Sequence, residues 1–492
     1  MSRMKFFLSI ILIFTVVFFL IGCEQEESEK KVSKLTIYSL NDFHGALVPS
    51  GEQPGFAKIG KYLKDQKRSN PDETIILSAG DMFQGTALSN LERGRYVVDL
   101  MNNIGFDAMA IGNHEFDWGL DVIKSYTDGN LENGEANFPF LGANIIEKST
   151  GERVDYLDAY TIIQRGNLKV GIIGAIGKDL EDDIATPMIQ DYDLVDSLPI
   201  IKDITKDLRA NKGVNIVIVN LHEMDEFLNA QLAGLEGDYQ IDAIINGHAH
   251  RTMNQLIRGS NNRQVPVVQA GSSGEYIGRI ILTIDPENKT VTDANVNLVY
   301  GTSLVEEDPE IKEYLDEKIV ETAPIFERVI GIAGELVSRA KVWDWAPDLL
   351  KNVYDADLGI INSGGIRAAA FNIFYDQEIT INKMFEIMPF DNSIKSTYLT
   401  GAQLMDVFRD SKNGLVYSDN VDRNQKTVNG EPVDPEKLYK VVTIDYVFDK
   451  TELPFINGVD TVVYGHLFRD VMAEEIERLH NLGQKWIPSK YE

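Results

Sequence analysis

Short apolar segments recur between Lys34 and Tyr300, and most of them are followed directly by a cluster of polar residues. The segments are rich in β-branched and aliphatic residues, and the stretches between them are long enough for crossover helices. They span 35–40, 74–77, 108–111, 170–173, 216–219, 243–245 and 265–268. Near-continuous apolar strands joined by helices are typical of sheets that are covered on both faces. The pattern therefore predicts an α/β domain.

The polar clusters after these predicted strands contain most of the histidines in the chain. Five of the seven histidines lie there, together with two aspartates and an asparagine. These residues are Asp42, His44, Asp81, Asn113, His114, His222, His248 and His250. Ligands of α/β sheets bind outside the carboxyl ends of the strands, so we expect these side chains to converge. Imidazole and carboxylate groups suit Zn, Mn, Fe or Co, and this many donors exceeds the need of one tetrahedral ion. The sequence thus indicates a pair of divalent metal ions.

Four motifs in this order resemble the calcineurin-like metallophosphoesterase family. They are Asp42-x-His44, Gly80-Asp81-x-x-x-Gly85, Gly112-Asn113-His114-Glu115 and Gly247-His248-x-His250. The longer matches at 80–85 and 112–117 narrow the resemblance to the 5'-nucleotidase branch. This resemblance implies an α/β fold with a four-layer metallophosphoesterase β-sandwich flanked by helices. It also implies a second α/β (α+β) substrate-binding domain and hydrolysis of phosphate esters with two divalent metal ions.

The resemblance assigns a role to each residue of the predicted metal site. Asp42, His44 and His250 are expected to hold one ion. Asn113, His222 and His248 are expected to hold the other, with Asp81 bridging the two.

His114 and Asp117 form the predicted catalytic pair beside the metals. They are three residues apart and can therefore meet across a turn, where Asp117 would orient His114. By resemblance, this pair stabilises the transferring phosphoryl group. The competing interpretation is structural, with Asp117 capping a helix.

A second region with its own predicted strands occupies the last third of the chain. We assign residues 34–300 to the metallophosphoesterase domain, 301–328 to a connecting helix and 329–492 to the substrate-binding domain. Predicted strands at 358–361 and 439–444 belong to this second domain.

Two segments of the second domain resemble the nucleotide-binding domain of 5'-nucleotidases, namely 362–367 and 388–392. The resemblance implies that Arg367 meets the anionic groups of the substrate and that Phe390 stacks on its base. The other predicted substrate-binding residues are Asn362, Asn392, Tyr446 and Asp460. The segment from Arg339 departs from the usual pattern of the family, so a second substrate arginine is in doubt.

The first 22 residues are predicted to be a secretory signal peptide, because a short basic start precedes an apolar run that ends at Leu20-Ile21-Gly22-Cys23. That ending resembles the bacterial lipobox, which implies acylation of Cys23, a charged tether over 23–33 and attachment to the extracytoplasmic face of a bacterial membrane. The alternative is an uncleaved membrane anchor, which also places the body outside the cytoplasm.

The formal net charge of −29 disfavours binding to a nucleic-acid polymer, since the surface would repel its backbone. The leading hypothesis is hydrolysis of nucleoside monophosphates, with 2',3'-cyclic nucleotides and nucleotide sugars as competing substrates. Two alternatives stay open at this point. One is the same metal chemistry on a non-nucleotide or sulfur-conjugated substrate, and the other is a non-catalytic nucleoside-binding lipoprotein. The sequence does not indicate an oligomeric state.

Overall fold

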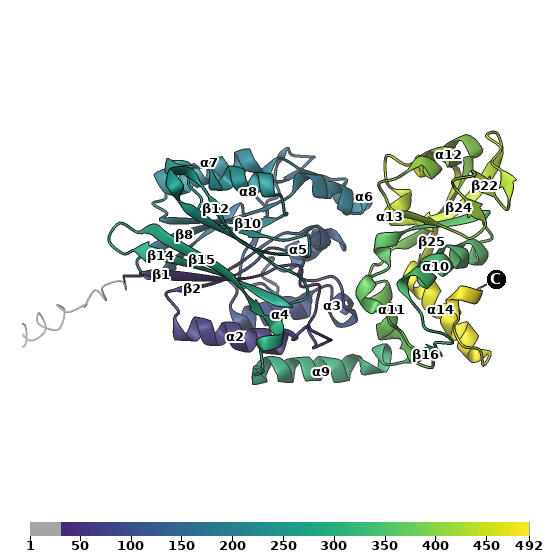
Figure 1. Cartoon of the computed structure of the whole chain (residues 1–492), viewed down its shortest axis with the longest axis horizontal. Helices are drawn as coiled ribbons and strands as arrows, with labels where there is room; N and C mark the ends of the chain where they lie inside the picture. Colours follow the sequence, from purple (N-terminus) through teal and green to yellow (C-terminus); the bar gives the residue numbers. More distant parts are fainter. Residues whose placement is uncertain (1–30, 492) are drawn as a thin grey trace, which may run out of the picture.

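A computed structural model describes residues 31–491 and shows two domains that are joined by helix α9 (Pro309–Phe326) (Figure 1). Cys23 and the predicted signal peptide lie outside the described residues, so both stay predictions. Within residues 31–491, no helix is both long and apolar enough to cross a membrane.

Two six-stranded sheets form the centre of the first domain. The first sheet contains, in spatial order, β15 (Thr290–Tyr300), β14 (Tyr276–Asp285), β1 (Lys34–Leu40), β2 (Thr74–Ser78), β3 (Ala108–Ala110) and β4 (Phe140–Leu141). The second contains β12 (Thr252–Arg258), β13 (Gln264–Ala270), β11 (Ala243–Asn246), β10 (Ile216–His222), β8 (Leu168–Ile176) and β7 (Tyr160–Arg165). The strands β1 to β4 are parallel, as are β8, β10, β11 and β13, so their carboxyl ends share one edge of each sheet.

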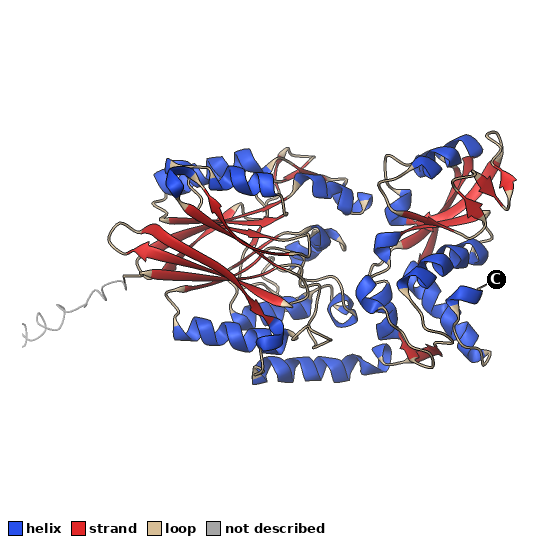
Figure 2. Cartoon of the chain, in the orientation of Figure 1, coloured by secondary structure: helices blue, strands red, loops and turns tan. Residues whose placement is uncertain are grey.

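Both faces of each sheet are covered, which explains the unbroken apolar strands. Between the sheets, side chains of β1 and β2 such as Leu35 and Leu77 pack with Ile172 and Ile218 of the second sheet. The outer face of the first sheet packs against α2 (Phe56–Ser69) and α4 (Arg95–Ile104). That of the second sheet packs against α7 (Ser197–Ala210) and α8 (Glu226–Ala233). Figure 2 shows the resulting layers, and the predicted four-layer sandwich is confirmed.

Several strand ends differ from their predicted positions, and the ends of β10 and β3 lie nearest the polar clusters. The strand β10 continues to His222, so this histidine is the last residue of a strand rather than part of the following loop. The strand β3 ends at Ala110, one residue earlier than predicted. Pairing with a neighbouring strand sets the end of β10, because β8 pairs with it as far as Ile176 opposite His222.

The second domain has a mixed five-stranded sheet with helices on its faces, as an α/β (α+β) domain requires. Its strands are, in order, β20 (Leu415–Tyr417), β17 (Leu358–Asn362), β24 (Leu438–Ile444), β19 (Ser393–Thr400) and β25 (Val459–Leu467). Its longer helices are α10 (Arg339–Val353), α11 (Ile381–Ile387), α12 (Gly401–Arg409) and α14 (Phe468–Asn481). The loop after β17, the segment before β19 and the short helix α13 (Asp445–Phe448) after β24 all face the first domain (Figure 1).

Candidate active site

The loops at the carboxyl ends of β1 and β11 bring together the first group of metal-ligand candidates. One donor atom from each of Asp42, His44 and His250 lies within 4.8 Å of the others. The Nε2 atoms of His44 and His250 are 2.9 Å apart, and Nε2 of His250 is 3.6 Å from Oδ1 of Asp42. Donor atoms at this spacing can share one cation.

The second group lies beside the first, at the ends of β2, β3, β10 and β11. Donor atoms of Asp81, His222 and His248 also lie within 4.8 Å of one another. The Asn113 Oδ1 atom is 3.1 Å from Nε2 of His222 and 3.0 Å from Nδ1 of His248. Oδ2 of Asp81 is 3.2 Å from the same His222 nitrogen. These four residues thus surround a second position for a cation.

The donor chemistry of the two groups fits divalent metal ions. Nδ1 of His44 lies 2.9 Å from the Gln84 carbonyl, and Nδ1 of His222 lies 2.6 Å from the Ala79 carbonyl. A carbonyl oxygen only accepts hydrogen bonds, so each Nδ1 carries a proton, and Nε2 is the nitrogen that each neutral ring would offer to a metal. Burial, opposed in part by His222 and reinforced by the charge of Asp81, raises the pKa of Asp42 to about 7. A divalent cation beside these carboxylates would favour their ionised forms.

The backbone of this edge is strained where the candidate ligands lie. Asp42, His44, Asp81, His248 and His250 have φ values of 49°, 51°, 56°, 74° and 53°. Residues other than glycine rarely adopt this left-handed region, and such strain persists mainly where function requires it. Two glycines allow the loops that carry these residues to pack closely against one another. Gly80 has a φ of 91°, and a Cβ at Gly85 would lie 2.4 Å from the His44 carbonyl oxygen.

Glu115 is a functional residue to which we gave no role from the sequence. Its side chain is buried and accepts hydrogen bonds from the backbone N–H groups of Asp81 (2.8 Å), Met82 (2.9 Å) and Gly112 (2.7 Å). It therefore ties the loop after β2 to the loop after β3. Its place in the Gly-Asn-His-Glu motif was the available signal, but the sequence alone does not show where its carboxylate points.

The predicted catalytic pair is in contact. His114 Nδ1 is 2.9 Å from Asp117 Oδ2, and the backbone N–H of His114 donates to Asp81 Oδ1 at 2.9 Å. Burial lowers the pKa of His114, but the charges of Asp117 and Asp81 outweigh this effect and the pKa lies above its usual value. The ring is therefore suited to carry a proton beside the metal groups.

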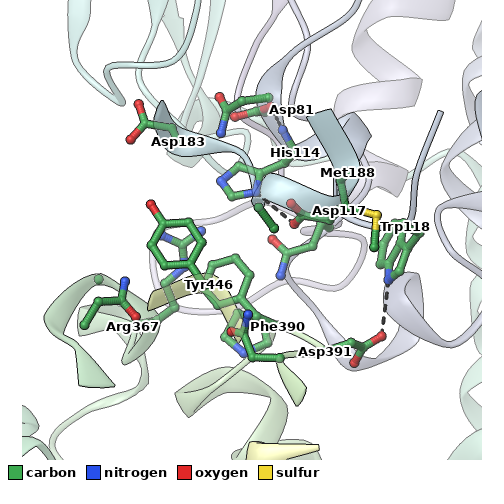
Figure 3. A pocket seen from close by; sticks show the side chains of 18 of the residues that line it. Asp81, His114, Asp117, Trp118, Asp183, Met188, Arg367, Phe390, Asp391 and Tyr446 are labelled. Atoms are coloured by element: carbon green, nitrogen blue, oxygen red, sulfur yellow. Dashed lines mark hydrogen bonds and ion pairs between the residues drawn. The ribbon is translucent and has the colours of Figure 1, made fainter. Parts of the chain in front are cut away.

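A cavity of about 470 Å³ joins this edge to the second domain (Figure 3). Five of the six predicted substrate-binding residues line it, namely Asn362, Arg367, Phe390, Asn392 and Tyr446. Asp445 holds Asn392 in place by accepting a hydrogen bond from its Nδ2 atom at 2.8 Å. The Arg367 guanidinium lies 4.8 Å from the centre of the Phe390 ring, and no acceptor in residues 31–491 binds it. This cation is therefore available to an anionic substrate.

Asp460, the sixth predicted substrate-binding residue, lies outside this cavity, and its role stays a prediction. It is an exposed residue of β25, the edge strand that pairs with β19, and it does not line the cavity. The residues after Tyr446 complete α13 and form a further turn, and Asp460 lies in the strand β25 that follows them. Arg339 is also outside the cavity. Its guanidinium donates to the carbonyls of Ile366 (2.6 Å) and Ser363 (3.1 Å), and so supports the loop that carries Arg367.

Comparison with known proteins agrees with this geometry. Residues 35–252 match the calcineurin-like phosphoesterase family, and residues 331–456 match the 5'-nucleotidase C-terminal domain. An apyrase from Tabanus yao is 27% identical over 84% of this chain and 85% of that protein. A snake venom 5'-nucleotidase from Naja atra is 28% identical over 77% of this chain and 78% of that protein. The crystal structure of a 5'-nucleotidase precursor from Thermus thermophilus has the same fold, with a TM-score of 0.75 and 22% identity over 91% of this chain and 96% of that chain.

A four-layer sandwich with two cation positions at one edge defines a metal-dependent phosphoester hydrolase whose cofactors are two divalent metal ions. The domain order narrows this class. Because a phosphoesterase domain is followed by the 5'-nucleotidase C-terminal domain, the chain belongs to the 5'-nucleotidase family. The resemblance found in the sequence is thereby confirmed.

Proposed function

We propose that this enzyme hydrolyses phosphate esters of nucleotides, with nucleoside 5'-monophosphates as the preferred substrates. The observation that carries this proposal is the cavity between the domains. It has metal-ligand candidates and the His114–Asp117 pair on one side, and a free arginine with two aromatic rings on the other. Relatives named 5'-nucleotidase and apyrase support a nucleotide as the substrate.

The phosphate of the substrate is placed between Arg367 and the metal groups. Two divalent cations held by the candidate ligands of the two groups would supply polarisation of the phosphoryl group and a more acidic water as the nucleophile. The guanidinium of Arg367 holds the non-bridging oxygens through charge-assisted hydrogen bonds. Asp117 fixes Nδ1 of His114, so that the Nε2–H of the charged ring stabilises the transferring phosphoryl group and donates to the leaving oxygen.

The leaving nucleoside is held by the second domain. Phe390 and Tyr446 offer aromatic faces to a base, and stacking on an aromatic ring accepts any base. Asn362 and Asn392 offer amide groups for hydrogen bonds to the base or ribose.

We further propose that the enzyme works outside the cytoplasm, attached to a bacterial membrane by a lipid on Cys23. The Leu20-Ile21-Gly22-Cys23 sequence after an apolar run supports this location. Replacement Cys23→Ala should move the protein from the membrane fraction to the soluble fraction or leave it unprocessed. Unchanged membrane association with normal processing would contradict the lipid.

The substrate proposal is tested with purified protein loaded with Mn²⁺. The panel contains nucleoside 5'-monophosphates, 2',3'-cyclic nucleotides, nucleotide sugars and a simple aryl phosphate. We expect the nucleoside monophosphates to give the highest kcat/KM and a chelator to abolish turnover. Turnover of the aryl ester alone would keep the metal chemistry and overturn the nucleotide assignment.

A further inference from the structure

Trp118 connects the catalytic pair to the segment of the second domain that carries Phe390. It directly follows Asp117, and its Nε1–H donates to Oδ2 of Asp391 at 3.3 Å across the domain boundary (Figure 3). Asp391 directly follows Phe390. The hydrogen bond between Trp118 and Asp391 thus joins the segment that carries Asp117 to the segment that carries Phe390.

The acceptor of this hydrogen bond is held firmly by its own domain. The buried guanidinium of Arg469 donates to Oδ1 of Asp391 at 2.6 Å, and also to the backbone carbonyls of Met388 (3.3 Å), Pro389 (3.1 Å) and Phe390 (3.2 Å). One arginine therefore fixes the whole segment. Trp118 contacts a preorganised target rather than a mobile loop.

Two further contacts join this segment to the first domain. Nδ2 of Asn90 donates to the Pro389 carbonyl at 2.8 Å, and the rings of His114 and Phe390 stack with their centres 5.8 Å apart and an interplanar angle of 26°. The stack leaves no room for a base between these two rings. A base that contacts Phe390 must therefore lie elsewhere in the cavity, where Trp118 and Met188 also form the lining.

Met188 extends the apolar surface of Trp118. It lies on the short helix α6 (Thr186–Ile189), and a Cβ placed on Gly119 would be 3.9 Å from its sulfur. Oγ1 of Thr186, at the start of this helix, donates to the Asp449 carbonyl of the second domain at 2.8 Å. The side chains of Trp118 and Met188 are partly buried and line the cavity together with Phe390 and Tyr446.

We propose that Trp118 is a specificity-determining residue, which forms with Met188 an apolar wall of the leaving-group subsite on the first domain. The inference rests on the proposed function and extends it, since the nucleoside is then recognised by both domains. A nucleoside is large enough to contact this wall and the aromatic rings of the second domain, whereas a small alcohol is not. Binding of the correct leaving group therefore favours the arrangement that places Arg367 beside His114.

The test compares two substrates in four proteins. The kcat/KM for a nucleoside 5'-monophosphate is divided by that for glycerol phosphate in wild type, Trp118→Ala, Trp118→Phe and Phe227→Ala. Phe227 is an exposed aromatic residue of α8 outside the cavity and serves as the matched control. Thermal unfolding of each variant shows whether the fold is intact.

We expect Trp118→Ala to lower this ratio about tenfold or more, mainly through KM for the nucleotide, because stacking and apolar contact with a base are lost. Trp118→Phe keeps an apolar wall and should lower the ratio by less than about threefold, and Phe227→Ala should not change it. Met188→Ala, on a separate element, should also lower the ratio. It gives an independent result if Trp118→Ala does not fold.

Three results would overturn the inference in distinguishable ways. A wild-type enzyme without nucleotide preference would remove the proposed function and this inference together. A wild-type preference that survives in both Trp118→Ala and Met188→Ala would remove only the apolar wall. Equal losses on both substrates, with KM unchanged, would mean that Trp118 acts only by positioning Asp117.

Discussion

The two sides of the cavity are built in different ways. On the first domain, the candidate metal ligands are mostly buried, their backbone is strained, and internal hydrogen bonds such as those of Glu115 fix the loops. On the second domain, Arg367 has no hydrogen-bonded acceptor among residues 31–491, and Phe390 meets side chains of the other domain. Contacts inside the first domain fix the ligand loops. On the second side, Arg469 holds the segment that carries Phe390, and hydrogen bonds from Asn90 and Trp118 then join that segment to the first domain. This difference indicates that the first domain carries the chemistry, and that the second domain supplies the aromatic faces for the substrate opposite the wall formed by Trp118 and Met188.

The largest effect is expected from Asp81→Asn. The carboxylate that is predicted to bridge the two cations would lose its charge, and several kcal/mol of transition-state stabilisation corresponds to a loss of about 10³-fold or more in kcat/KM. Because the chemistry is common to all substrates, nucleotides and glycerol phosphate should be affected alike. Metal content by mass spectrometry should fall in parallel. Full activity in this variant would refute the bridging assignment.

His114→Ala should lower kcat by about 10²–10⁴-fold while both metals stay bound. The ring supplies a proton and a charge to the transition state but no ligand atom to either metal group. Steady-state kinetics together with the metal-to-protein ratio provide the measurement. Loss of a metal ion would show instead that His114 is part of the metal site.

Arg367→Met should lower kcat/KM for nucleotides by about 10–100-fold, since a hydrogen bond to a charged group contributes about 1.5–3 kcal/mol. The methionine keeps much of the apolar contact with Phe390 but removes the cation. An assay of the same variant on glycerol phosphate shows which part of the substrate Arg367 binds. A similar loss there means that Arg367 binds the reacting phosphate, and no loss on either substrate would contradict its role.

Asp460→Ala is expected to have the smallest effect, a change of less than about twofold on any substrate. The side chain is exposed on β25 and outside the cavity. The measurement is kcat/KM of the Asp460→Ala variant for nucleotides. A loss comparable with that of Arg367→Met would show that the assignment from the sequence was right and that the domains rearrange during turnover.

Much of the first domain could be predicted because its signals are local. Apolar strands followed by His, Asp and Asn residues identify both the fold and the edge where ligands bind, and the five histidines at strand ends meet there as expected. The end of β10 was misplaced, since pairing with β8 extends this strand through His222. That extension depends on a neighbour that is distant in sequence.

The second side of the cavity was harder to predict because its contacts are not local. Phe390 and Tyr446 line the cavity, whereas Asp460, whose role was predicted together with theirs, lies outside it on β25. Trp118 was not singled out, although it follows Asp117 directly. Its significance depends on Asp391, a residue of the other domain.

Phe390→Ala tests most directly whether the two domains have different roles, one in chemistry and the other in binding the base. The measurement is kcat/KM for a nucleoside 5'-monophosphate and for glycerol phosphate, in wild type and variant, with both proteins loaded with Mn²⁺. We predict that kcat/KM for the nucleotide falls roughly 10–100-fold in the variant, because base stacking is lost. The value of kcat/KM for glycerol phosphate should fall far less. An equal fall for both substrates, or an unchanged nucleotide value, would contradict it.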